Sequence, residues 1–225
     1  MTIIVNPNIE IPTTIAKEEL PDLENLRRDV HEVMSKNDPS HDATHIHRVI
    51  SLSQYILKEE QSRTEQQYNS SLIHVAALTH DVFDKKYNPD LSPEKKGLHD
   101  LLVRHGWSSD FAEDVNDVVE YVSFSKEISN PEQAEAALRR NPELAIVQDA
   151  DRLDAIGAVG IGRVFAFGAA RMPQRGLCGC IEHFVDKLEI LEGMMKTETG
   201  RRLAKERTER LRIFRQWWKE EMALV

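Results

Sequence analysis

Apolar residues recur at steps of three and four along most of this chain, and this period limits its fold more than any other feature of the sequence. Residues at these steps lie on one face of an α-helix, so each apolar stripe needs a partner that buries it. The first stripe consists of Leu23, Leu26, Val30, Val33 and Met34. No run alternates apolar and polar residues well enough to predict a strand. The sequence therefore predicts an all-α fold in a single domain.

Turn-forming residues divide the pattern into segments. Pro39 lies between turn formers and ends the first segment, whereas Ser92-Pro93 favours a helix start, because serine can cap a helix and proline fits its first turn. We predict helices at about residues 20–34, 42–57, 71–82, 93–105, 110–121, 142–155, 158–169, 181–195 and 200–222, one more starting near residue 131, and a Gly/Cys-rich loop at 172–180. Residues 1–19 are predicted to form an N-terminal arm, and residues 20–225 the helical domain.

The charge and hydropathy of the chain exclude several classes of function. Its formal net charge of −9 argues against a nucleic-acid polymer as partner, because such a partner requires a basic face. A small anionic substrate remains compatible, since a bound cation and a few arginines can reverse the field inside one cleft. No stretch approaches the roughly 20 apolar residues of a membrane span, and the N-terminus lacks the features of a signal peptide. We therefore expect a cytoplasmic protein without a membrane partner.

Metal-capable side chains concentrate in three of the predicted helices. His45 lies near the start of one, His80 and Asp81 end another, and Asp151 lies in a third. Helical bundles build core metal sites from facing helices in this way. A mixed histidine and aspartate set suits Mn, Fe, Zn, Ni or Mg. His47 points to roughly the opposite side of its helix from His45, so the two cannot face one site.

These positions resemble the H…HD…D signature of the HD-domain superfamily of metal-dependent phosphohydrolases. The chain is most similar to a branch of small single-domain HD hydrolases that includes nucleotide pyrophosphohydrolase-type members. The matching motifs are Ser-His-Asp-x-x-His-x-x-Arg-Val at 40–49, His-Asp-x-x-Asp-x-Lys at 80–86, Ser-Phe at 123–124, the block at 149–158 and Thr-Glu-Thr-Gly at 197–200. The resemblance covers roughly residues 26–210 and implies an HD-type helical bundle. Asp149, in the long block, is expected to pair with Arg152.

The resemblance also implies roles for individual residues. The implied ligands of one divalent ion (Mn, Mg, Ni, Co, Fe or Zn, with Mn favoured) are His45, His80, Asp81 and Asp151. Expected catalytic residues are Asp84, which would orient or deprotonate the attacking water, Lys86, which would neutralise phosphate charge, and His41, a general acid or a support of the ligands. Expected substrate contacts are Arg48, Lys85, Ser123 and Asp154.

The implied reaction is hydrolysis of a phosphate ester or anhydride of a small molecule, with a nucleoside mono- or triphosphate as the expected substrate. One alternative is a di-iron oxygenase of HD type, which needs additional histidine ligands; between Asp84 and Asp151 the chain offers only His99 and His105. The other alternative is a non-catalytic nucleotide-binding HD module. The sequence leaves the oligomeric state open and is compatible with a homodimer.

Overall fold

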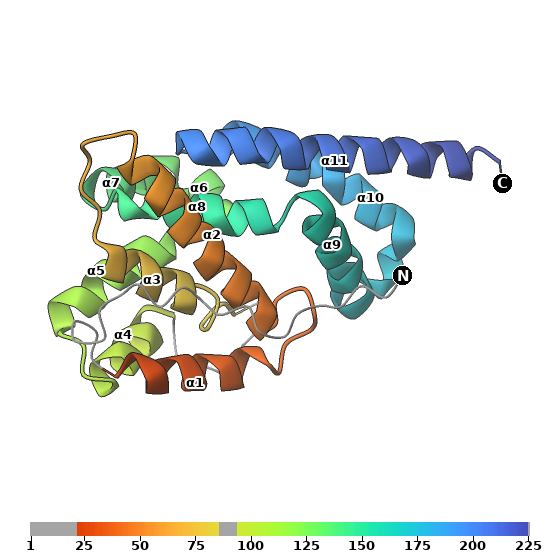
Figure 1. Ribbon diagram of the computed structural model, residues 1–225. Coiled ribbons are helices and arrows are strands. Elements are labelled where there is room, and N and C mark those ends of the chain that lie inside the picture. The colour runs from red at the N-terminus through yellow and green to blue at the C-terminus, as the bar shows by residue number, and fades with distance from the viewer. Residues whose placement is uncertain (1–21, 86–93, 225) are drawn as a thin grey trace, which may run out of the picture.

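The computed structural model describes residues 22–85 and 94–224, which form eleven α-helices, two short 3-10 helices and no strand (Figure 1). The elements are α1 Leu23–Met34, α2 Ala43–Gln61, α3 Ser70–Thr79, α4 Glu94–Arg104, α5 Ser109–Glu120, α6 Phe124–Ser129, α7 Pro131–Arg140, α8 Glu143–Asp154, α9 Gly157–Arg171, η1 Pro173–Arg175, α10 Gly176–Asp186, η2 Leu188–Met194 and α11 Glu198–Met222. The predicted all-α fold is confirmed. The predicted arm at residues 1–19 lies outside the described residues.

Helix α3 is the centre of the bundle. Every residue from Leu72 to Thr79 is buried, and the helix packs between α2, α5 and α8. A helix that is apolar all round has no solvent face, so it must be enclosed by other helices. Because α3 ends inside the protein, the residue that follows it, His80, is also buried. The apolar helix α3 therefore places His80, the residue that follows it, in the interior of the protein.

Helices α9, α10 and α11 form a second layer that packs against α8 and one another (Figure 1). The chain enters this layer through a 71° bend between α8 and α9. Gly157, at the bend, has φ of 75°, a conformation that side chains with a Cβ rarely adopt. In the part of the chain that the structure describes, no single helix is long and apolar enough to cross a membrane; α8 and α9 reach that length and composition only as the bent pair.

The second layer differs from the helices that we predicted for it. Residues 176–180 belong to α10, so the predicted loop is wrong there, and the predicted helix over 181–195 is interrupted at Lys187 and continues as η2. Leu188 and Leu191 are buried from within this 3-10 turn. Their three-residue spacing fits one face of a 3-10 helix as well as one face of an α-helix, so the period could not separate the two.

The buried carboxylate of Asp149 attaches the start of α11 to α8. Asp149 accepts hydrogen bonds from the backbone nitrogens of Lys196 and Thr197, at 2.9 and 2.7 Å, and from Thr197 Oγ1 at 2.7 Å. Arg152 does not form the predicted pair with Asp149; it binds Glu127 and donates to the Met194 carbonyl oxygen at 3.0 Å. The predicted pair is wrong because the helix start offers Asp149 several donors that need no opposite charge.

Gly200 makes this attachment possible, so we expect Gly200→Ala to destabilise the fold. A Cβ at this position would lie 2.2 Å from Asp149 Oδ2, and the hydrogen-bonded carboxylate would have to move. We expect a loss of about 1–3 kcal/mol in the free energy of unfolding, measured by chemical denaturation. Gly162→Ala is the matched control, since its Cβ meets nothing within 4 Å and alanine favours a helix. Equal stability of the two variants would contradict this account.

His74 lies on α3 with 1% of its surface exposed. Its Nε2 atom lies 2.9 Å from Arg27 Nη2, so Nε2 accepts that hydrogen bond and the ring is neutral. Burial, followed by the positive charge of Arg27, lowers the pKa of His74 to about 4. Below pH about 6.5 the unfolded chain therefore binds a proton at His74, whereas His74 in the folded chain stays neutral down to about pH 4.

This difference in proton binding predicts a pH dependence of stability. As pH falls from 7.5 to 5, the unfolded chain gains a proton at His74 and the folded chain does not, so His74 lowers stability by about 2 kcal/mol. We expect His74→Gln to remove this part of the loss, measured as the free energy of unfolding at the two pH values. Gln61→Ala, at an exposed position at the end of α2, is expected to keep the full wild-type dependence. An identical dependence in all three proteins would contradict the assignment.

Candidate metal centre

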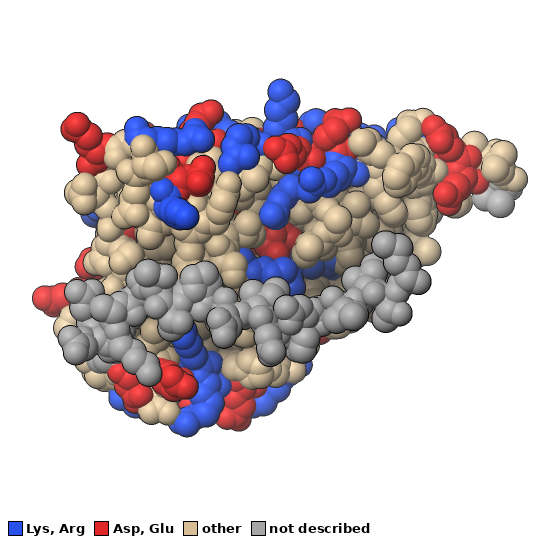
Figure 2. Space-filling model, viewed as in Figure 1, with Lys and Arg blue, Asp and Glu red and all other residues tan. Residues whose placement is uncertain are grey.

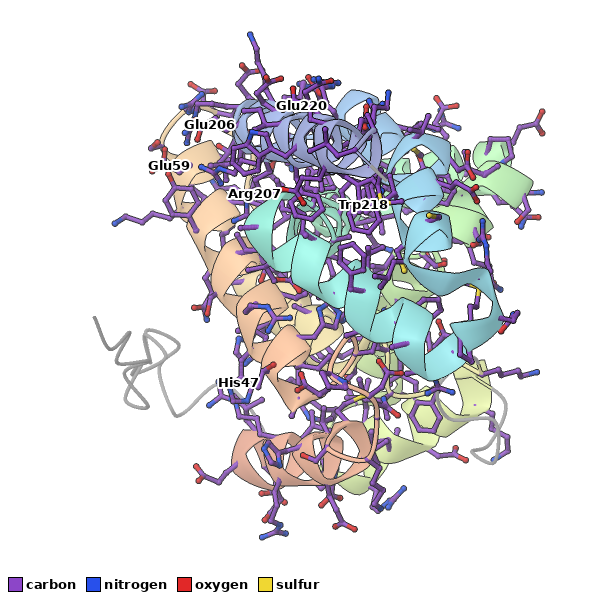
Figure 3. The ribbon with its side chains drawn as sticks, turned by 90° about the vertical axis from the view of Figure 1, so that its right-hand side faces the viewer. His47, Glu59, Glu206, Arg207, Trp218 and Glu220 are labelled. Atoms are coloured by element: carbon purple, nitrogen blue, oxygen red, sulfur yellow. The ribbon has the colours of Figure 1, made fainter. Side chains whose placement is uncertain are left out.

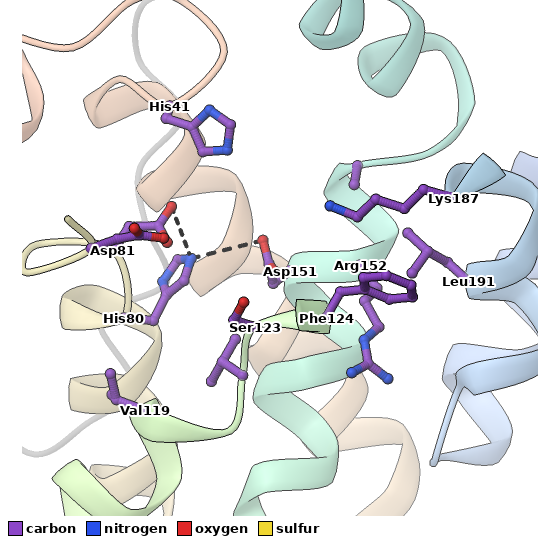
Figure 4. A pocket seen from close by; sticks show the side chains of 13 residues that line it. His41, His80, Asp81, Val119, Ser123, Phe124, Asp151, Arg152, Lys187 and Leu191 are labelled. Atoms are coloured by element: carbon purple, nitrogen blue, oxygen red, sulfur yellow. Dashed lines mark ion pairs between the residues drawn. The ribbon is translucent and has the colours of Figure 1, made fainter. Parts of the chain in front are cut away.

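The ends of α2, α3 and α8 bring the four predicted ligands together. His45 Nε2 lies 3.3 Å from His80 Nε2, 3.2 Å from Asp81 Oδ2 and 3.5 Å from Asp151 Oδ1. His80 Nε2 lies 3.5 Å from Asp81 Oδ2 and 3.8 Å from Asp151 Oδ1 (Figure 4). His47 is exposed and projects from the outer side of α2, as its helical position predicts (Figure 3).

These distances fit a bound cation. Transition-metal ions lie about 2.0–2.2 Å from nitrogen and oxygen ligands, so neighbouring ligand atoms around one ion are about 3.0–3.6 Å apart. Four of the separations, 3.2–3.5 Å, agree with that spacing, and the separation of 3.8 Å between His80 and Asp151 is slightly longer. The side chain of His45 is fully buried, whereas 26% of the Asp151 side chain is exposed. The ligand set is thus closed on the protein side and open on the side of Asp151, which suits an ion with exchangeable positions.

Hydrogen bonds orient both imidazole rings toward the centre. His80 Nδ1 donates to the Ala77 carbonyl oxygen at 2.9 Å, and His45 Nδ1 donates to Asp154 Oδ2 at 2.8 Å. A ring that donates through Nδ1 presents the lone pair of Nε2 to a metal. Both histidines therefore offer the same nitrogen to one point.

Without a cation, the centre holds a proton instead. Burial opposes charge on His80, but the carboxylates of Asp81 and Asp151 outweigh it and raise the pKa of His80 to about 9. Burial likewise opposes charge on Asp151, yet the hydrogen bond and charge of His80, with the charge of His45, lower its pKa to about 2. The two carboxylates thus stay ionised and attract positive charge, which is the electrostatic requirement for a metal site.

Asp154 supports the centre from behind and is 1% exposed. Besides its contact with His45, its Oδ1 accepts from Arg48 Nε at 2.7 Å, and its Oδ2 lies 3.1 Å from Arg163 Nη1. Burial raises the pKa of Asp154, but these donors more than offset it and hold that pKa well below its usual range. Neither Asp154 nor Arg48 is among the described residues that line the cleft, although we predicted substrate contacts for both.

His41 lies in the turn before α2 and lines the cleft in front of the ligands (Figure 4). Ser40 Oγ donates its hydrogen to Asp38, so it accepts the hydrogen of His41 Nδ1, which lies 2.7 Å away. Burial lowers the pKa of His41 to about 3; Asp81 opposes this shift, and Arg163 adds to it. His41 is therefore neutral near pH 7 and carries its lone pair on Nε2.

The cleft in front of the centre has about 660 Å³ of space, part of it open to solvent. Thirteen described residues line the cleft: His41, His80, Asp81, Asp84, Val119, Val122, Ser123, Phe124, Asp151, Arg152, Ala155, Lys187 and Leu191. Asp84 and Ser123 thus lie where a substrate would contact them. Lys85 is exposed and is not among the described lining residues, and Lys86 lies outside the described part of the chain.

Lys187 was not among the predicted site residues, although its position one turn from His183 allowed both to face the cleft. It lies 31 residues beyond the end of the recognisable HD segment, at the interruption between α10 and η2. Its only sequence signal was its position one turn after His183. The helix that we predicted there would have continued past Lys187, so the direction of its side chain had to come from the fold.

Comparison with known proteins agrees with this geometry. The HD domain family matches residues 42–156, which contain all four predicted ligands. The chain belongs to the HD domain family. The protein YpgQ of Bacillus subtilis is 34% identical over 197 residues, which cover 84% of this chain and 88% of YpgQ. This HD-family chain is a metal-dependent hydrolase of the phosphohydrolase superfamily, as its sequence predicts.

Solved structures show the same fold. A crystal structure of B. subtilis YpgQ in complex with ADP has a TM-score of 0.67 and 34% identity, and covers 88% of this chain and 94% of that one. An HD-superfamily hydrolase from Bacillus thuringiensis has a TM-score of 0.64 and 27% identity, and covers 89% of this chain and 96% of that one. A protein from Lactobacillus plantarum has a TM-score of 0.72 and 25% identity, over 90% and 97% of the two chains.

The buried contacts of Asp154 predict that Asp154→Asn weakens metal binding. An asparagine can turn its amide group toward His45, which would then lose the acceptor that fixes its ring. We expect the affinity for Mn²⁺ to fall by about 10–100-fold, measured by calorimetric titration of the metal-free protein. Asp100→Asn is the control, because Asp100 forms an exposed ion pair with Lys96 on α4. A folded Asp154→Asn protein with wild-type affinity would contradict the role.

Proposed function

We propose that this protein uses one divalent ion, with Mn favoured, to hydrolyse a phosphate ester or anhydride of a nucleotide, a nucleoside mono- or triphosphate. The observation that carries the proposal is a cleft lined by three of the predicted ligands, His80, Asp81 and Asp151, and also by His41 and Asp84. The fourth predicted ligand, His45, is buried beside them and forms with His80 and Asp81 a group that could hold a metal ion. The ADP in the crystal structure of YpgQ supports a nucleotide as the ligand class.

The side chains of the cleft have distinct tasks in this reaction. When bound, a divalent ion with open positions activates a water molecule and polarises a phosphoryl oxygen. Asp84 lines the cleft and orients the attacking water through its carboxyl group. The lone pair of His41 Nε2 favours a role as proton acceptor over the general acid that we also predicted. Ser123 contacts the substrate, and Lys85 and Lys86 stay predicted phosphate contacts.

Two predicted substrate contacts take a different role in this proposal. Arg48 donates to Asp154 through Nε at 2.7 Å and Nη2 at 3.0 Å, and Asp154 in turn holds His45. We assign Arg48 and Asp154 as positioning residues. Arg48 binds Asp154, and Asp154 binds the predicted ligand His45, so these polar atoms are already engaged.

The positions of His99 and His105, the histidines available for a second iron, argue against the di-iron oxygenase. His99 Nε2 lies 3.0 Å from Ser109 Oγ, and His105 Nε2 lies 3.0 Å from Asp29 Oδ2. Neither residue is among the described residues that line the cleft. The intact ligand set counts against a non-catalytic module, because nucleotide binding alone does not require all four ligands.

The surface supports a small substrate rather than a polymer. On the face shown in Figure 2, acidic and basic side chains are interspersed and form no continuous basic track. A nucleic-acid polymer binds along a basic track because its phosphates are regularly spaced. A cytoplasmic location and a homodimer stay predictions.

The proposal is tested with metal analysis and a substrate screen. We expect the purified protein to retain a divalent ion and, with added Mn²⁺, to release phosphate or pyrophosphate from a panel of nucleoside mono-, di- and triphosphates. Asp81→Asn is expected to lose both the metal and the activity, because a ligand to the ion is removed. Asp114→Asn, at an exposed position of α5, is the matched control. Full metal content and activity in Asp81→Asn would refute the proposal, and two irons with oxygen consumption would favour the oxygenase.

A further inference from the structure

A stripe of side chains on α9 contacts the turn that carries His41. Arg163, Phe167 and Arg171, the α9 stripe, lie four residues apart and therefore on one face of the helix. Arg163 Nε donates to the Ser40 carbonyl oxygen at 2.6 Å. The ring of Phe167 meets the ring of His41 at 67°, with 5.9 Å between the two centroids. Two members of the α9 stripe thus contact the end of the turn directly.

The third member, Arg171, reaches His41 through a chain of hydrogen bonds. Arg171 Nε donates to Asp38 Oδ2 at 2.9 Å, and Asp38 Oδ1 accepts from the backbone nitrogen of Ser40 at 3.0 Å and from Ser40 Oγ. Ser40 Oγ lies 2.7 Å from His41 Nδ1, whose hydrogen it accepts. Ser40 is fully buried, so its bonds are shielded from water. The acceptor that fixes the tautomer of His41 is therefore held in place from α9.

Arg163 also connects this turn to the metal centre. It is 8% exposed, and its Nη1 atom lies 3.1 Å from Asp154 Oδ2, which accepts from His45. The guanidinium group is planar and rigid, so it fixes the separation between the groups that it binds. One side chain of α9 thus contacts both the support of a predicted ligand and the backbone next to His41.

We propose that the α9 stripe positions His41 for the reaction by holding the turn at residues 38–41 at a fixed distance from the metal ligands. This inference rests on the proposed function, in which His41 is the proton acceptor. Neither Arg163 nor Arg171 is among the described residues that line the cleft, so both are positioning residues that act through the turn. The HD domain match ends at residue 156, before α9 begins, so this support lies outside the matched segment.

The first experiment measures amide hydrogen exchange of the full-length protein by mass spectrometry. The backbone nitrogen of His41 donates to the Asp38 carbonyl oxygen at 3.0 Å, so its exchange rate reports on the turn. We expect Arg163→Gln to accelerate exchange at residues 40–42 by about 10–100-fold, as loss of one hydrogen bond from a charged donor does. Exchange in α5 is expected to stay within about twofold of wild type, since an opening confined to the turn leaves other helices protected.

Two further variants complete this experiment. Arg201→Gln is the matched control, because Arg201 also donates to a backbone carbonyl oxygen, that of Lys196 at 3.0 Å, but lies on α11. If Arg163→Gln does not fold, Arg171→Gln tests the same hold from the more exposed end of the α9 stripe. We then expect an acceleration of about two- to fivefold at residues 40–42, as loss of a partly exposed ion pair does.

The second experiment measures kcat and metal affinity. We expect Arg163→Gln to lower kcat by about 10–100-fold, because a displaced proton acceptor reacts more slowly. Its affinity for Mn²⁺, measured by calorimetry, is expected to stay within about threefold of wild type, since Asp154 keeps both hydrogen bonds from Arg48. Arg163→Gln combined with His41→Gln is expected to have the kcat of His41→Gln alone, because Arg163 acts through His41.

The outcomes separate this inference from the proposed function. Unchanged exchange at residues 40–42 in a folded Arg163→Gln protein overturns the inference, and so does equal acceleration in α5, which would indicate a general loss of stability. If exchange accelerates at the turn but the wild-type protein hydrolyses no nucleotide, the hold on His41 stands and the proposed function falls. If the wild-type protein hydrolyses nucleotides and Arg163→Gln keeps the full kcat, the function stands and the inference falls. Additive losses of kcat in the double variant also overturn the inference.

Discussion

The carboxylate of Asp154 is the buried charge on which the site depends. Moving a carboxylate out of water costs several kcal/mol unless partners replace its hydration. Here His45, Arg48 and Arg163 all contact it. Because they come from α2 and α9 while Asp154 ends α8, one charge joins three helices. Arg163 also donates to the Ser40 carbonyl oxygen at 2.6 Å, which ties the turn that carries His41 to the same point. The orientation of His45 is thus fixed by the fold itself.

The roles that the sequence could predict are those that few residue types can fill. Few residue types bind a divalent ion, and the spacing of His45, His80, Asp81 and Asp151 placed them on helix ends that a bundle brings together. The helical period predicted the fold for a similar reason, because apolar stripes must be buried. Roles that several residue types can fill were harder to predict. Arg48 was suited to a phosphate as well as to a carboxylate, and only the fold places Asp154 beside it.

Other features depended on tertiary structure that no local pattern encodes. Asp149 and Arg152 are three residues apart on α8 and were expected to pair. Instead, Asp149 binds the backbone at residues 196–197, and Arg152 binds Glu127 and the Met194 carbonyl oxygen. The interruption at Lys187 follows no proline or glycine. The apolar spacing in that region fits an α-helix and a 3-10 helix equally, so the helix break and the direction of Lys187 could not be predicted.

The HD domain match ends at residue 156, whereas Lys187 and Leu191 reach the same cleft from the layer that follows. The reactive centre and the opposite wall are therefore encoded by separate stretches of the chain, joined at the bend after α8. Substitutions in η2 and the end of α10 can accumulate without disturbing a ligand. Such a division of labour lets a lineage of enzymes retain one chemistry while its substrate preference diverges.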